Sequence, residues 1–206
     1  MPIKISLTQF LTYNATVSTP AKIKCVSKIK NQNAYNPVFD YWKDLRDAIK
    51  DCLKNKKPIN SLLIVPAHVK ADRRANYLSD ARKFVEYISK HSVSYFDSPH
   101  AYWESADGKL IVSASAEIGL CIDGQNYLLK NYYKKKDKNV KVAAKNIKST
   151  LALMKLSKQK TVTPNSRFAV LNLQNGKLYP DSEVDDLVKL TLNVDANTFV
   201  NIWESI

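Results

Sequence analysis

Three Asx-Gly pairs, each placed between apolar runs, constrain the fold of this chain more than any other feature. They are Asp107-Gly108, Asp123-Gly124 and Asn175-Gly176. Such a pair is the strongest local signal for a two-residue hairpin, because both central residues of that turn need a positive φ. The chain has only four glycines, so these positions predict antiparallel strands joined by short turns.

The Asp123-Gly124 turn also predicts a strand register, obtained by counting outward from a two-residue loop. The predicted pairs are Ile122 with Gln125, Leu120 with Tyr127, Ile118 with Leu129, and Glu117 with Lys130. Opposed residues share a face of an antiparallel pair. The hairpin therefore has one apolar face, and a carboxylate and an ammonium group lie side by side on the other. The sequence leaves the turn between Ile111 and Ile122 undefined.

Helical periodicity surrounds this strand-rich region. Apolar residues recur at spacings of three and four in the ranges 19–30, 36–54, 70–90 and 138–157, and a short helical segment begins near Ser6. Asp181 and Asp195 are candidate caps of two further helices, ending near 190 and 206. The predicted class is α+β: N-terminal helices, an antiparallel β-meander of three to four strands, a helix, a β-hairpin and C-terminal helices.

Length and composition predict one folded unit, with an N-terminal helical region (1–66) packed against an α+β region (67–206). The three cysteines lie far apart, which argues against a disulfide framework or a zinc cluster. No apolar run approaches the roughly 18 residues of a membrane span, and the first residues do not resemble a signal peptide. We therefore expect a cytoplasmic protein without a membrane partner.

Charge is distributed unevenly along the chain, which has a formal net charge of +13. Residues 130–160 contain eleven lysines and a single acid, Asp137, whereas residues 181–206 contain six acids and a single lysine, Lys189. This asymmetry suggests one surface that attracts a polyanion and another with a different role.

The leading hypothesis is a nucleic-acid-binding protein with DNA or RNA as its partner. Lysines would neutralise phosphates, and tyrosine rings would offer faces on which unpaired bases stack. The helix after the aromatic run adds a lysine stripe, and a second basic cluster begins the 70–90 helix. The candidate binding residues are Lys130, Tyr132, Tyr133, Lys134, Lys135, Lys136, Lys141, Lys145, Lys148, Arg73 and Arg74.

An enzymatic alternative centres on Glu117 and Lys130 as weak catalytic candidates. The order helix, three antiparallel strands, helix, strand over residues 70–173 is similar to the core of the PD-(D/E)xK nuclease superfamily. This resemblance implies a metal-dependent nuclease that uses Mg²⁺; without it, no cofactor or metal site is expected. The superfamily's D/E-x-K motif would fall on Leu128-Leu129-Lys130, where this chain departs from it. Asp123 and Glu86 are possible substitutes for the missing acid.

A third hypothesis is a protein-interaction subunit of a larger assembly. The acidic C-terminal region carries Phe199, Ile202 and Trp203 on one side of a predicted helix, and such a helix can dock in an apolar groove of a partner. The same residues would equally serve as part of the core. Neither a serine-hydrolase nor a common nucleotide-binding motif occurs.

Overall fold

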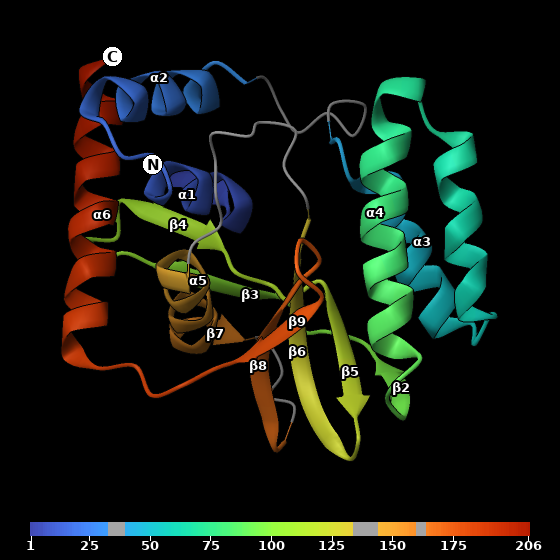
Figure 1. Cartoon of the computed structure of the whole chain (residues 1–206). Helices are drawn as coiled ribbons and strands as arrows, with labels where there is room; N and C mark the ends of the chain where they lie inside the picture. Colours follow the sequence, from blue (N-terminus) through green and yellow to red (C-terminus); the bar gives the residue numbers. More distant parts are fainter. Residues whose placement is uncertain (33–39, 134–143, 160–163) are drawn as a thin grey trace.

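The α+β class is confirmed by a computed structural model, which describes residues 1–32, 40–133, 144–159 and 164–206. Two mixed β-sheets lie side by side, and helices cover both of them (Figure 1). Within the described ranges, no helix combines the length and the apolar character that crossing a bilayer requires.

The first sheet contains strands from widely separated parts of the chain. Its order is β1 (Ile3–Ser6), β4 (Leu110–Ser113), β3 (Ala101–Glu104) and β7 (Lys158–Gln159), and β1 runs parallel to β4. Helix α1 (Leu7–Asn14) follows β1 directly. Ser6 and Gln9 form a capping box, in which each side chain accepts a hydrogen bond from the other's backbone N–H. Helices α2 (Thr19–Lys30) and α6 (Asp186–Ser205) pack beside it.

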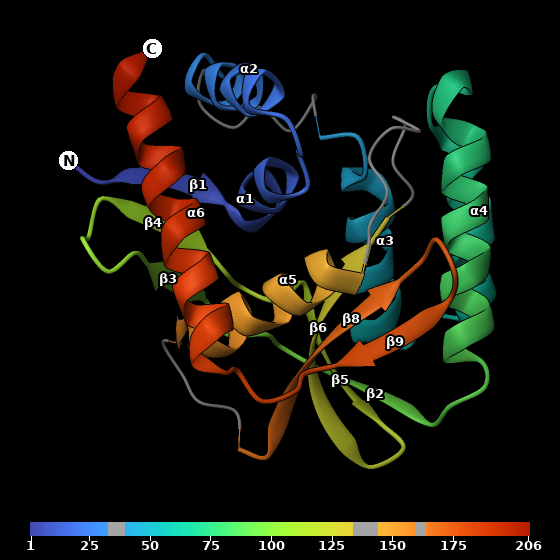
Figure 2. The same ribbon diagram turned by 60° about the vertical axis from the view of Figure 1, so that its left-hand side comes forward.

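The second sheet has the order β2 (Val93–Phe96), β5 (Ile118–Ile122), β6 (Gln125–Tyr132), β8 (Ser166–Asn172) and β9 (Lys177–Pro180). Only β6 and β8 are parallel neighbours in it. Helix α5 (Ala144–Leu156) lies between these two strands in the chain and covers one face. The other face carries α3 (Lys43–Lys54), the 3-10 helix η2 (Ile59–His68) and α4 (Ala71–Ile88) (Figure 2).

The predicted hairpin register is confirmed at Asp123-Gly124. Both turn residues have positive φ, +49° and +87°, and Ile122 pairs with Gln125. Ile118 pairs with Leu129, as counting predicted. Asn175-Gly176 lies in the turn between β8 and β9 as expected, but four residues separate these strands, and of the pair only Gly176 has a positive φ.

The first predicted turn is longer than two residues. Strands β3 and β4 form a hairpin, but five residues separate them, and of the Asp107-Gly108 pair only Gly108 has a positive φ. Asp107 instead accepts hydrogen bonds from the Ser105 hydroxyl and the Lys109 backbone N–H. The turn that the sequence left undefined between Ile111 and Ile122 lies between β4, which ends at Ser113, and β5, which begins at Ile118. These two strands belong to different sheets.

The C-terminal region forms one helix rather than the two that the sequence suggested. Asp185, and not Asp181, is the N-cap of α6, and its side chain accepts from Val188 N at 2.7 Å. Asp195 lies inside the helix, 4.0 Å from Lys22 of α2. No glycine or proline interrupts residues 186–205, so nothing in the backbone forces a second start. Lys30 of α2 donates to the carbonyls of Trp203 and Ile206 at the helix end.

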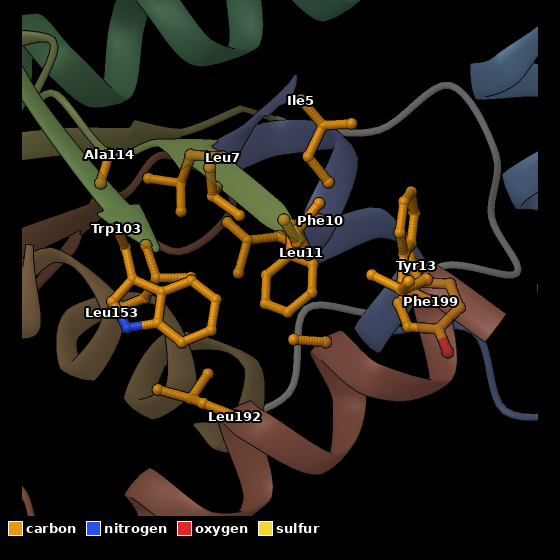
Figure 3. Packing of buried hydrophobic residues seen from close by; sticks show 14 of the residues in the cluster. Ile5, Leu7, Phe10, Leu11, Tyr13, Trp103, Ala114, Leu153, Leu192 and Phe199 are labelled. Atoms are coloured by element: carbon orange, nitrogen blue, oxygen red, sulfur yellow. The ribbon is translucent and has the colours of Figure 1, made fainter. Parts of the chain in front are cut away.

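The N-terminal helices pack in two separate hydrophobic clusters. Helices α1 and α2 pack with the first sheet, α5 and α6, and Figure 3 shows the aromatic centre of this cluster. Helices α3, η2 and α4 pack instead on the second sheet. Phe199 is fully buried in the first cluster, and Ile202 and Trp203 pack against it. These residues of the proposed docking helix are therefore part of the core.

Truncating Phe199 tests this assignment. The ring of Phe199 lies 5.1 Å from that of Tyr13 and is fully buried, so Phe199→Ala should lower the free energy of unfolding by about 3–5 kcal/mol. Leu187→Ala on the same helix is the matched control, because Leu187 is 71% exposed; its effect should stay within about 0.5 kcal/mol. Urea denaturation measures both, and equal effects would contradict a core role for Phe199.

Candidate functional site

A carboxylate–ammonium pair marks the end of the β5–β6 hairpin. Lys130 Nζ lies 3.3 Å from Glu117 Oε2, and the two side chains are only 15% and 7% exposed. The ladder has its last pair at Ile118 and Leu129. Beyond it, the backbone N–H of Asn131 donates to Glu117 Oε2 at 3.2 Å. The carboxylate thus takes the place of a backbone acceptor just before β5 begins, and the predicted neighbours Glu117 and Lys130 do meet.

Tyr133 completes the hydrogen bonding of Glu117. Its hydroxyl donates to Oε1 at 2.6 Å. Burial, followed by the negative charge of Glu117, raises the pKa of Tyr133 well above 10. The Tyr133 ring stacks on Trp42 with centroids 5.1 Å apart, and Trp42 in turn stacks on Tyr77 at 5.0 Å. The Tyr133 ring is therefore engaged in internal packing.

Tyr132 is also directed inward. It packs against the cluster around α5, and its hydroxyl forms a hydrogen bond with Thr150. Burial raises its pKa above the ordinary value. The structure thus places both tyrosines of the predicted stacking surface in internal contacts.

A second ion pair lies near Glu117, at the start of α3. The Arg46 guanidinium donates to Asp40 Oδ2 at 2.7 Å. Burial lowers the pKa of Arg46, but the hydrogen bond and charge of Asp40 outweigh it, with a further contribution from Glu117, so the pKa is raised. Asp40, Arg46, Glu117 and Lys130 together carry no net charge. No sequence motif singled out Arg46, because only folding brings α3 to the end of β6.

Asn131 is the least satisfied polar residue beside these groups. It is 2% exposed, and among the described residues neither its side-chain nitrogen nor its oxygen has a hydrogen-bond partner. Its amide acts to lower the pKa of Tyr133, which places it next to that hydroxyl. Buried amides of this kind are rare, because losing hydration without a hydrogen bond costs about 1–3 kcal/mol. Apart from this contact with the Tyr133 hydroxyl, the Asn131 amide has no partner within the described ranges.

The nuclease resemblance can be compared with the observed connectivity. Within the second sheet, α4, β2, β5, β6, α5 and β8 give a helix, three antiparallel strands, a helix and a strand parallel to the third. This order is not consecutive in the chain, because β3 and β4 of the first sheet lie between β2 and β5, and β7 lies between α5 and β8. The substitute acids are elsewhere: Asp123 lies in the turn at the far end of the hairpin, bonded to His91 and Ser92, and Glu86 pairs with Lys83 and Lys90. Among described residues, no three His, Cys, Asp or Glu side chains could hold a metal together.

The predicted basic surface is described only in part. Lys134, Lys135, Lys136 and Lys141 lie outside the described residues, as does the side chain of Lys145. Lys148 of α5 lies 3.7 Å from Asp185. Two further lysines of the 130–160 segment also have acidic partners: Lys155 lies 3.4 Å from Asp181, and Lys158 lies 3.2 Å from Glu104.

Arg73 and Arg74 lie on another part of the molecule. Both belong to α4, on the face of the second sheet opposite α5 (Figure 2). The Arg73 guanidinium lies over the ring of Tyr41 at 4.8 Å, and Arg74 donates to the carbonyl of Val69 at 3.2 Å. The fold therefore does not bring these arginines together with Lys148.

Sequence reasoning missed Arg167, which belongs to β8. Its Nε lies 3.1 Å from Asp181, the carboxylate that Lys155 also contacts. Two cations from separate elements thus share one carboxylate that is only 9% exposed. The long sequence distance between Lys155, Arg167 and Asp181 gave no signal of this grouping.

Comparison with known proteins adds no family to these observations. No protein-family model matches the chain, and no curated protein matches it at a significant level.

Removing the Tyr133 hydroxyl tests the network around Glu117. Tyr133→Phe keeps the stacking on Trp42 but removes a hydrogen bond to a carboxylate, so we expect a loss of about 1.5–3 kcal/mol of unfolding free energy. Tyr127→Phe on the same strand is the control, with an expected change within about 0.5 kcal/mol. Chemical denaturation at neutral pH measures both, and a Tyr133→Phe effect no larger than the control would refute the network.

Proposed function

We propose that this protein binds nucleic acid, mainly through contacts between its lysines and phosphates. The carrying observation is a local surplus of positive charge: residues 130–160 hold eleven lysines and one acid. Around α5, Lys148, Lys155 and Arg167 come from two elements to one region of the surface. Phosphate neutralisation with release of counterions is the sequence-independent term that supplies most non-specific affinity.

The placement of Tyr132 and Tyr133 narrows this proposal. Both tyrosines are engaged in internal packing and hydrogen bonds, so base stacking on them is not part of it. Lysine attracts phosphate as a point charge and lacks the planar fork with which arginine reads guanine. We therefore propose phosphate binding to DNA or RNA with limited sequence specificity.

Salt dependence provides the test. A Lys135→Ala, Lys141→Ala, Lys145→Ala variant should bind a fluorescent oligonucleotide more weakly, and the slope of log K against log salt should shrink by about one for each lost contact. The matched control is Lys54→Ala, Lys57→Ala, Lys90→Ala, which removes the same charge from lysines paired on the α3–α4 side. Absent binding at low salt, or equal losses in both variants, would end the proposal.

A metal-dependent nuclease is the second candidate, favoured by the buried pair Glu117–Lys130 and the unsatisfied amide of Asn131 beside it. The Glu117 carboxylate and the Asn131 amide oxygen are the kind of ligands that Mg²⁺ takes. The metal would supply Lewis-acid activation of a phosphodiester. Lys130 would stabilise negative charge on the phosphate. The set of possible metal ligands is small, because Leu128 stands where the D/E-x-K motif has its acidic residue.

Cleavage assays separate the nuclease from a protein that only binds. If the nuclease proposal holds, wild type cleaves DNA or RNA with Mg²⁺ or Mn²⁺, Glu117→Ala loses at least about 100-fold in rate, and the surface control Glu86→Ala keeps full activity. Circular dichroism confirms that both variants remain folded. An inactive wild type, or unchanged cleavage by Glu117→Ala, rules this candidate out.

A further inference from the structure

The acidic segment that joins β9 to α6 lies along the basic helix α5 (Figure 2). Asp181 Oδ2 is 3.4 Å from Lys155 Nζ, and Asp185 Oδ2 is 3.7 Å from Lys148 Nζ. Lys155 also donates to the carbonyl of Ser182 at 3.1 Å. The most acidic part of the chain thus contacts the helix of its most lysine-rich part.

The spacing of these contacts follows the helix. Lys148 and Lys155 are seven residues apart, which places them on one face of α5 at a separation of about 10 Å along its axis. In the sequence, Lys141 precedes Lys148 by the same seven residues. Segment 181–186 contacts both Lys148 and Lys155, with one carboxylate against each lysine.

We propose that segment 181–186 is an internal competitor that covers part of the proposed phosphate-binding surface, and that its contact with Lys148 is exchanged for phosphate when nucleic acid binds. This inference rests on the proposed function and names a regulation of the same surface. Carboxylates and phosphates compete for the same ammonium groups. A ligand with few charges cannot replace several carboxylates, whereas a long polyanion can, so the segment selects for polyanions.

The contacts near α6 are suited to exchange. Lys148 and Asp185 remain 55% and 57% exposed, and exposed ion pairs at this distance are weak and are screened by salt. Glu183, Asp185 and Asp186 are all exposed. The Lys148–Asp185 contact can therefore break without exposing a buried carboxylate, and Glu183 and Asp186 add negative charge beside it.

The two ends of the segment are anchored by other contacts. Asp181 is nearly buried, and Arg167 holds it through Nε at 3.1 Å and through a second bond to its carbonyl at 2.7 Å. At the other end, Asp185 caps α6 by accepting from the N–H of Val188 through Oδ1, so that only its Oδ2 contact with Lys148 is available for exchange. The anchors keep the acidic side chains close to α5 and thus at a high effective concentration.

A charge-neutralising variant tests the inference without removing the helix cap. Glu183→Gln, Asp185→Asn, Asp186→Asn raises the net charge by three, and asparagine is as good an N-cap as aspartate. The control Asp47→Asn, Asp51→Asn, Glu86→Gln raises it equally on α3 and α4. The probes are a fluorescent 20-nucleotide single-stranded RNA and a 20-base-pair DNA duplex, measured at several salt concentrations.

We expect the segment variant to bind at least one probe about 1.5–5-fold more tightly than the control variant does, the range expected from releasing the one exposed pair Lys148–Asp185. Adding Lys148→Ala to the segment variant should remove part of this gain, because the two sites share one contact. Equal affinities of the two neutralised variants, or weaker binding by the segment variant, would overturn the inference.

The outcomes also separate this inference from the proposed function. Binding by wild type with no difference between the two neutralised variants would leave phosphate binding standing and remove the competitor. Binding by the segment variant alone would support a surface fully covered in the wild type. No binding by any of the proteins at low salt would refute both.

Discussion

The parallel ladder between β6 and β8 is the interaction on which the rest of the structure depends. Seven residue pairs join the two strands, from Asn126 with Ser166 to Tyr132 with Asn172. One face of this pair packs on α3 and α4 and the other on α5. Because parallel strands need a crossover, the ladder also fixes α5 over the sheet, and with it the lysines that meet the acidic segment.

The polar groups around Glu117 are explained by the point at which the ladder between β5 and β6 stops. Strand β6 continues past the last pair with β5, so the N–H of Asn131 needs another acceptor, and Glu117 provides it. A carboxylate drawn into this position needs compensating donors, which Lys130 and Tyr133 supply. The pair therefore has a structural role whether or not it has a catalytic one, and in the described part of the chain the Asn131 amide beside it lacks a clear hydrogen-bond partner.

Local features of the fold could be predicted from the sequence, and long-range features could not. The Asp123-Gly124 turn carries its own geometry, so the register and the contact of Glu117 with Lys130 followed from counting. The pairing of β1 with β4 and the division of β4 and β5 between two sheets leave no local signal. Arg46 and Arg167 were missed for the same reason, and the inward placement of Tyr133 depends on Trp42 from another helix.

The charge asymmetry of the sequence acquires a different meaning once the fold is known. An excess of lysine in one segment and of acid in another can indicate two surfaces for two partners, yet around α5 the two segments contact each other. The acids of 181–186 are too few to neutralise the eleven lysines of 130–160. A region that is partly compensated but still positive can attract polyanions over long distances, while the described contacts of Lys148 and Lys155 are made with carboxylates. Under the proposed function, binding would then be an exchange of carboxylate for phosphate, and its strength would depend on how many charges the ligand brings at once.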